Sequence, residues 1–442
     1  MITSDLLRNV GVRHIWIFSS FVTAMHLAEV LLLCSCCTVL SAKSSRPNII
    51  FILADDYGFH DIGYHKSEIK TPNLDKLAAA GVKLENYYVQ PICTPTRSQF
   101  MSWKYQIHTG LQHGIIWDAQ PNGLPLDSPT VADKIKQAGY STHAVGKWHL
   151  GFYKDAYLPS NRGFDSYYGY LTGSEDYFTH IRCDNHDSRY SFCGLDLRNN
   201  TNPVFNETGH YSTYLFTERA ISVIKDHDES KPFFLYVAYQ STHAPLQVPG
   251  KYLNPYSHIK DLNRRSFAEN VCTYRRATKT DVKCSWLNAP KSKIRPEIAT
   301  MEELFPPRKP NYNQSDILTQ PKGAKLFNNT FDTRIRAAIR VGDWKLITGS
   351  PGFLPPSSGN DSWIPPPHLS KETVVDKDDK EKNLWLFDPN EHNDLSASQP
   401  GIVKKLLDRL EYYQKTGIPP RYPDPDPKCD PKLHGGVWGP WE

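Results

Sequence analysis

Two short, almost continuous apolar runs constrain the fold of this 442-residue chain more than any other feature. The first covers residues 48–54 and ends at Asp55-Asp56, and the second covers residues 232–239 and precedes a Ser-Thr-His triplet. Runs of this length without polar alternation are typical of strands that are buried on both faces, as in parallel sheets. We therefore expect a central sheet with both faces covered.

Helix and strand signals alternate between these two runs. Proline in a first turn and glycine after a last turn mark the ends of the expected helices. In chain order, the sequence predicts a helix over residues 72–80, a helix over 128–139, a strand over 141–145 and a helix over 217–227. Strands that alternate with helices predict an α/β fold.

The later part of the chain has a different pattern. Periodicity fades beyond Ser266, and residues 285–325 are rich in Pro, Lys and Glu without a clear period. Gly342-Asp343 predicts a hairpin turn, and residues 402–415 have the apolar spacing of an amphipathic helix. Because 442 residues exceed one compact core, we expect residues 335–442 to form a small C-terminal α+β subdomain.

Composition limits the class of partner. Hydrophobic residues make up 39% and charged residues 22%, which is typical of a soluble globular protein. The formal net charge is only +4 with signs well mixed, so we expect no nucleic-acid partner.

The N-terminal region predicts entry into the secretory pathway. Basic residues precede an apolar segment that ends in small residues at Ser41 and Ala42, so residues 1–42 are expected to be a signal peptide. An uncleaved membrane anchor and translation from Met25 are the alternatives, but we expect no stable membrane span. Five sequons predict N-glycosylation at Asn199, Asn206, Asn313, Asn328 and Asn360.

Six cysteines lie beyond the predicted signal peptide. In an oxidising compartment, two close pairs predict local disulfides. These pairs are Cys183 with Cys193 and Cys272 with Cys284. Cys93 and Cys429 are left over, and a disulfide between them is the alternative to a functional role for Cys93.

Polar side chains follow three of the predicted strands. Asp55-Asp56 ends the first strand, Lys147 and His149 follow the second, and His243 follows the third. Ligands of open α/β sheets bind beyond the carboxyl ends of strands, so these side chains are expected at one edge. Paired aspartates suit a hard divalent cation, although a helix-capping Asp beside a solvated one is an alternative. The lysine and histidines, taken singly, are also compatible with loop and structural roles.

A specific motif lies between these strand ends. Residues 93–99 read Cys-Thr-Pro-Thr-Arg-Ser-Gln, which resembles the sulfatase signature Cys-x-Pro-Ser/Thr-Arg. Asp-Asp upstream and Gly-Lys-Trp-His-Leu-Gly downstream stand in the order of the sulfatase family. Further segments are similar to the arylsulfatase B, I and J branch, namely residues 105–113, 162–165, 245–249 and 435–441. The chain is thus identified as a member of the sulfatase family.

This resemblance implies an alkaline-phosphatase-like α/β fold, with a mixed sheet flanked by helices in a catalytic domain over residues 43–334. It implies that the formylglycine-generating enzyme oxidises Cys93 to formylglycine, whose hydrated form attacks sulfur. It also implies a Ca²⁺ ion held by Asp55, Asp56 and the group at position 93. The remaining implied roles are positioning by Arg97, sulfate binding by Lys147, proton acceptance by His149 and proton donation by His243.

The resemblance further implies hydrolysis of sulfuric esters in aryl sulfates or sulfated glycosaminoglycans, such as those with N-acetylgalactosamine 4-sulfate, in the lysosome or outside the cell. Two departures leave alternatives open. The family's Asp-Asn-Gly segment and second catalytic lysine have no counterpart, and residues 271–325 are atypical. Trp103 also follows Ser102 where the family has glycine. The alternatives are a catalytically impaired protein or a shortened isoform that at most binds sulfated glycans.

Overall fold

The computed structural model describes a defined part of the chain. The described residues are 46–85, 87–112, 114–185, 187, 189–252, 255–277, 331–333, 337–349, 384–387 and 393–442. The described residues from Asn48 onward belong to one compact unit. The predicted signal peptide, Cys284 of the predicted Cys272–Cys284 disulfide and the sequons at Asn313, Asn328 and Asn360 lie outside what is described. Within the described ranges, no helix is both long and apolar enough to cross a membrane.

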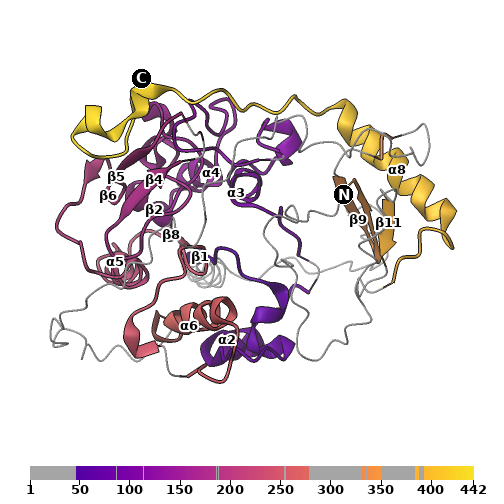
Figure 1. Cartoon of the computed structure of the whole chain (residues 1–442), viewed down its shortest axis with the longest axis horizontal. Coiled ribbons are helices and arrows are strands. Elements are labelled where there is room, and N and C mark those ends of the chain that lie inside the picture. The colour runs from indigo at the N-terminus through magenta and orange to yellow at the C-terminus, as the bar shows by residue number, and fades with distance from the viewer. Residues whose placement is uncertain are drawn as a thin grey trace, which may run out of the picture. The chain divides into compact units, whose positions relative to one another are not determined.

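A six-stranded sheet in the order β1-β8-β2-β3-β6-β7 forms the centre of this unit (Figure 1). Its strands are β1 (Ile49–Leu53), β2 (Ser141–Lys147), β3 (Ser166–Tyr170), β6 (Arg198–Asn199), β7 (Asn202–Pro203) and β8 (Phe233–Ala238). The first four strands in this order run parallel, and β6 and β7 add antiparallel pairs. The predicted mixed α/β sheet is confirmed.

The alternation of side chains along β8 explains how the sheet is buried. All six residues of β8 are buried, and alternate ones belong to different apolar clusters. Phe234 and Tyr236 pack with residues of helices α3 (Cys93–Ser102) and α4 (Val131–Gln137). Leu235 on the opposite face packs with α5 (Ser212–Lys225). Helices therefore cover both faces of the sheet, as a continuously apolar strand requires.

The predicted helices are present with small shifts at their ends. Helix α2 (Pro72–Ala80) has the predicted bounds. Helix α4 begins after the predicted Ser128-Pro129, because Thr130 and Asp133 form a reciprocal capping box at its N-terminus. Helix α5 begins five residues before the predicted residue 217, because its first turns are buried against the sheet. Helix α6 (Leu262–Ala277) extends into the region where the sequence period fades.

Shorter elements connect these layers. Strands β4 (Ile181–Asp184) and β5 (Phe192–Leu195) form an antiparallel hairpin. The 3-10 helices are η1 (Phe59–Asp61), η2 (Gly63–His65), η3 (Gln106–His108), η4 (Asp155–Tyr157), η5 (Pro159–Asn161), η6 (Gly250–Tyr252), η11 (Pro427–Cys429) and η12 (Pro431–His434).

The C-terminal region has its own small antiparallel sheet. Strands β9 (Ala337–Val341) and β10 (Trp344–Thr348) form the predicted hairpin, and β11 (Leu384–Phe387) pairs with β10. Helix α8 (Pro400–Lys415) buries its apolar stripe against this sheet in a separate cluster. The small α+β subdomain is therefore present, and its boundary at residue 335 stays a prediction.

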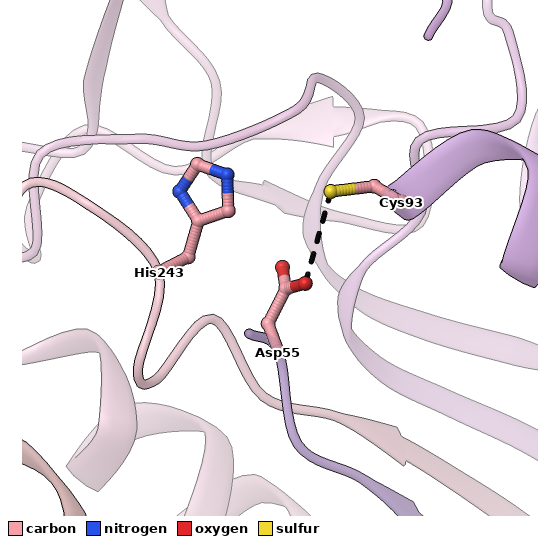
Figure 2. Close-up of side chains that lie close together, drawn as sticks. All are labelled: Asp55, Cys93 and His243. Carbon is pink, nitrogen blue, oxygen red and sulfur yellow. Dashed lines mark hydrogen bonds between the residues drawn. The ribbon is translucent and has the colours of Figure 1, made fainter. Parts of the chain in front are cut away.

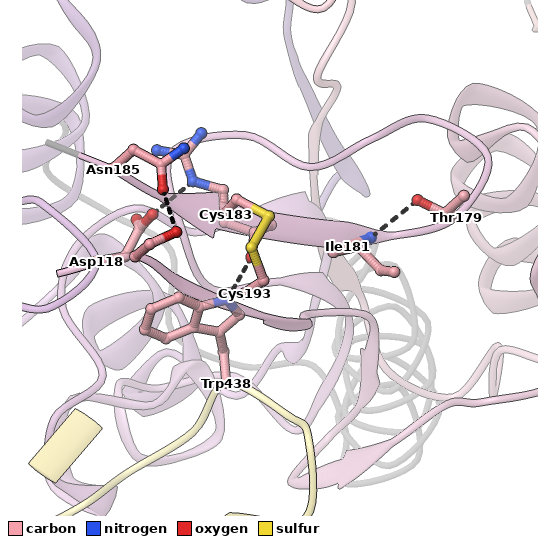
Figure 3. The surroundings of a disulfide bond; sticks show 9 residues. Asp118, Thr179, Ile181, Cys183, Asn185, Cys193 and Trp438 are labelled. Atoms are coloured by element: carbon pink, nitrogen blue, oxygen red, sulfur yellow. Dashed lines mark hydrogen bonds and ion pairs between the residues drawn. A yellow bond between two sulfur atoms is a disulfide. The ribbon is translucent and has the colours of Figure 1, made fainter. Parts of the chain in front are cut away.

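The hairpin β4–β5 holds a disulfide between Cys183 and Cys193, one of the two pairs expected from the sequence (Figure 3). Trp438 from the C-terminal segment lies beside this hairpin, and its indole nitrogen donates a hydrogen bond to the carbonyl of Arg182 at 2.9 Å. Cys93 and Cys429 are both free thiols, so the alternative disulfide between them is not formed.

Candidate active site

Asp55 lies just beyond the carboxyl end of β1 and is buried. Its Oδ2 atom accepts a hydrogen bond from Lys147 Nζ at 2.5 Å and lies 3.3 Å from Arg97 Nη2. Burial by itself raises the pKa of Asp55, but the charges of Lys147 and Arg97 outweigh burial and hold this pKa well below its usual range. Asp55 is therefore a permanently charged carboxylate in the interior.

Cys93 is the first residue of α3, and its sulfur points toward Asp55 (Figure 2). The Sγ atom lies 3.8 Å from Asp55 Oδ1 and 3.2 Å from Lys147 Nζ. Burial alone raises the pKa of the thiol, and the charge of Lys147 together with a hydrogen bond from His243 lowers it below 9.0 overall. The first position of a helix also favours a negative charge. The surroundings of position 93 therefore favour a negative charge on its side chain.

Arg97 lies one turn further along α3 and is fully buried. Its Nη1 atom donates hydrogen bonds to the carbonyl of Lys147 at 3.3 Å and to Tyr236 Oη at 3.2 Å. Burial by itself lowers the pKa of Arg97, but neighbouring Tyr236 and Asp55 raise it above the usual value. The guanidinium therefore joins α3 to the ends of β1, β2 and β8.

Lys147 and His149 follow from β2, whose last residues are buried. The imidazole Nε2 of His149 donates a hydrogen bond to the carbonyl of Ile116 at 2.9 Å. Burial, reinforced by the charge of Lys147, holds the pKa of His149 well below 6.5, so the ring is neutral. Its Nδ1 atom is buried and accepts no hydrogen bond within the described structure. The Nδ1 lone pair is therefore an open acceptor, although burial and the charge of Lys147 disfavour the protonated ring.

His243 reaches the same edge from the loop after β8. Its Nδ1 atom donates a hydrogen bond to the carbonyl of Ala244 at 2.6 Å, and its Nε2 lies 3.8 Å from Asp56 Oδ2. Burial alone lowers the pKa of His243, but the hydrogen bond to Cys93 and the charges of Asp55 and Asp56 raise it overall. His243 is therefore suited to hold and donate a proton beside position 93.

The predicted metal ligands are brought together only in part. Asp55, Cys93 and His243 offer ligand atoms within 4.8 Å of one another, and no other such group occurs in the described ranges. Asp56 lies outside this group, and its side chain is 55% exposed. Asp55, Asp56 and an oxygen at position 93 provide three of the six to eight oxygens that calcium takes, roughly half a shell. The described residues therefore do not complete a calcium site.

Sequence reasoning missed several contacts around these residues. Tyr236 lies in the apolar strand β8, and its buried hydroxyl needs a hydrogen-bond partner. The sequence pattern does not show that this partner is Arg97. Asp118 accepts a hydrogen bond from Arg182 Nε at 2.5 Å, and burial raises the pKa of Asp118 to about 6. No sequence signal places this buried pair near Gly173, whose lack of a side chain leaves room for the His149 ring.

The two predicted glycosylation sites that fall within the described ranges, Asn199 and Asn206, are both exposed. Accessibility is required for a glycan but does not test its attachment, so these sites stay predictions.

Known proteins resemble this chain in sequence and in fold. A family model described as Sulfatase matches residues 47–281. Mouse Arylsulfatase J is 41% identical over 498 aligned positions, which cover 91% of this chain and 81% of that protein. Rat Arylsulfatase G is 34% identical over 238 positions, or 49% of this chain and 44% of that protein. The crystal structure of Ps i-CgsB has a similar fold, with 22% identity, a TM-score of 0.60 and coverage of 86% of this chain and 95% of that chain.

The alignment with Arylsulfatase J also shows what this chain lacks. Its 498 positions exceed the 442 residues of the chain, so part of Arylsulfatase J has no counterpart here. Matches to relatives such as Arylsulfatase G span less than half the length of those proteins.

Proposed function

Because the chain belongs to the sulfatase family, we propose that it hydrolyses sulfate esters of sugars in glycosaminoglycans, with N-acetylgalactosamine 4-sulfate as the favoured group. The observation that carries this proposal is the convergence of Cys93, Lys147 and Asp55 at the carboxyl edge of the sheet. The reaction takes place in the lysosome or outside the cell, after the formylglycine-generating enzyme has acted on Cys93.

Formylglycine at position 93, once formed, supplies a hydrated aldehyde whose hydroxyl is the nucleophile for sulfur. The ammonium nitrogen of Lys147 lies 3.2 Å from Cys93 Sγ. It therefore lies beside the position of the nucleophile, where an oxygen of the attacked sulfate gains negative charge. The Nδ1 atom of His149, which has no hydrogen-bond partner within the described structure, accepts the proton that the attacking hydroxyl loses. His243, whose pKa is raised, donates a proton to the leaving oxygen.

Calcium is the metal expected for this reaction, and Asp55 and Asp56 are the residues that would hold it. Calcium would supply charge neutralisation for the sulfate. Since the described residues provide too few oxygens for calcium, no step of the proposal passes through the metal. Lys147 and Arg97 carry two positive charges against the one negative charge of Asp55, so one positive charge is left to neutralise sulfate.

A second candidate function follows from the incomplete site. The sequence contains no Asp-Asn-Gly segment, and Trp103, a residue that is 79% exposed, stands after Ser102. If Cys93 is not converted, the same edge binds sulfated glycans through Arg97, Lys147, His149 and His243 without hydrolysing them.

The test is to express the full chain in secretory cells that contain the formylglycine-generating enzyme. Mass spectrometry of the tryptic peptide with Cys93 is combined with hydrolysis of a chromogenic aryl sulfate by the same sample. We expect formylglycine and turnover, with turnover lost in Cys93→Ala and kept in Cys429→Ser, which changes the other free thiol. An unmodified Cys93 without turnover would exclude hydrolysis and leave glycan binding.

A further inference from the structure

Three side chains from three different elements meet at one point of the site. Asp55 follows β1, Cys93 begins α3, and His243 follows β8 (Figure 2). Their potential ligand atoms all lie within 4.8 Å of one another. We propose that the chain binds a zinc ion through Asp55, Cys93 and His243 while Cys93 is still a thiol. This proposal concerns the unconverted chain and does not rest on sulfate hydrolysis.

The chemistry of the three ligands selects zinc over calcium. A thiolate, an imidazole and a carboxylate form a ligand set that zinc commonly takes in proteins. Calcium, in contrast, takes oxygen ligands and needs more of them than this group offers. Three protein ligands leave the fourth position of a tetrahedral zinc open to water.

His243 is already arranged as a metal ligand. Its Nδ1–H donates to the carbonyl of Ala244 at 2.6 Å, so Nε2 is the ring nitrogen that gives up its proton when an ion binds. Histidines that bind metals through one ring nitrogen almost always donate the other N–H to a carbonyl, a carboxylate or water. This hydrogen bond fixes both the tautomer and the ring orientation before any ion binds.

Asp55 is likewise held for this role. Lys147 and Arg97 both contact its Oδ2 atom, at 2.5 Å and 3.3 Å, so Oδ1 faces Cys93 Sγ at 3.8 Å. Bonds of about 2.0–2.3 Å to a tetrahedral zinc place neighbouring ligand atoms roughly 3.5 Å apart. A shift of a few tenths of an ångström therefore brings the oxygen and the sulfur into coordination distance.

The charges and the access to the site also fit a divalent cation. When Cys93 is a thiolate, it carries a negative charge, as do Asp55 and Asp56, whereas Lys147 and Arg97 each carry a positive charge. The negative charges therefore exceed the positive ones by one, and zinc enters a site with net negative charge. The His243 side chain is 24% exposed, so an ion reaches the group from solvent.

The experiment uses the full, untagged chain from secretory cells that lack the formylglycine-generating enzyme, with mass spectrometry to verify the thiol at Cys93. Zinc content is measured after dialysis against buffered zinc, and cobalt absorption is recorded because a thiolate ligand gives a charge-transfer band. The variants are Cys93→Ser and His243→Ala. Their matched controls are Cys429→Ser, a free thiol elsewhere, and His210→Ala, whose side chain is 56% exposed.

We expect one zinc more per chain in the native protein than in Cys93→Ser. The cobalt band should be lost in Cys93→Ser and kept in both controls. The zinc affinity of His243→Ala should fall more than about 100-fold, because this change removes a ligand itself. Loss of only the hydrogen-bond partner of a ligand costs about 10–100-fold. Circular dichroism verifies that each variant is folded.

Three results would overturn the proposal. The first is a native chain that binds no zinc, and the second is zinc binding that is equal in all five proteins. The third is displacement of cobalt by excess calcium, because that result indicates a site made of oxygen ligands alone.

Discussion

Lys147→Met is the most informative perturbation of the site, because Lys147 neutralises a buried carboxylate. Its Nζ lies 2.5 Å from Asp55 Oδ2, and both residues are buried. Removing one partner of a buried ion pair costs about 3–5 kcal/mol, since the other charge is left without compensation. Arg97 still lies 3.3 Å from Asp55, so we expect the lower end of this range, about 3 kcal/mol of unfolding free energy.

The assay is a double-mutant cycle with Asp55→Asn, followed by urea unfolding and tryptophan fluorescence. Asp55→Asn leaves the ammonium buried, whereas the double variant removes both charges. We therefore expect the double variant to be more stable than the sum of the single effects predicts, by about 2 kcal/mol or more.

Lys154→Met is the matched control, because Lys154 pairs with Glu442 at 3.0 Å with a side chain that is 46% exposed. This surface pair should contribute less than about 1 kcal/mol. Additive single effects, or a cost for Lys147→Met no larger than that of the control, would refute the account of Asp55 as a carboxylate that depends on Lys147.

Three further predictions concern the surroundings of the site. His180 is buried and 3.1 Å from Glu175, and although burial alone lowers the pKa of His180, this carboxylate raises it above 6.5. The stability from this pair is complete below about pH 6.5 and is lost as pH rises through the raised pKa, so His180→Gln should weaken the fall of the urea midpoint as pH rises above about 6.5. Replacing Cys183 and Cys193 with serine opens a loop of sequence separation 10 and should lower the unfolding free energy by about 2–3 kcal/mol in the same urea assay. Gly146→Ala should cost about 3 kcal/mol or more, because φ is +97° and a Cβ there overlaps a carbonyl of β8; thermal unfolding that matches the native protein would contradict this.

The sequence predicted the sheet centre and the strand-end residues well, because both follow from short-range patterns. An uninterrupted apolar run specifies a strand buried on both faces, and parallel strands place their carboxyl ends at one edge. That reasoning alone brought Asp55, Lys147 and His243 together, and the structure places all three around Cys93.

Other features depend on contacts that no local pattern encodes. Helix α3 has little amphipathic character and carries proline at its third position, so the helix that presents Cys93 gives no clear periodic signal. The two-residue strands β6 and β7 are defined only by their partners. The ring orientation of His149 depends on a hydrogen bond to the carbonyl of Ile116, which lies 33 residues earlier in the chain, and its neutral state depends on burial and on the charge of Lys147.

The position of β1 in the sheet has a kinetic consequence for the site. In the described part of the chain, β1 pairs with β8 alone, and Ile50 and Ile52 are 49% and 51% exposed. A strand with one neighbour and an open apolar face separates from its sheet at less free energy than an interior strand does. Asp55 is attached to the end of this strand, so opening one row of interstrand hydrogen bonds removes Asp55 from the site, and amide exchange in β1 measures the free energy of that opening.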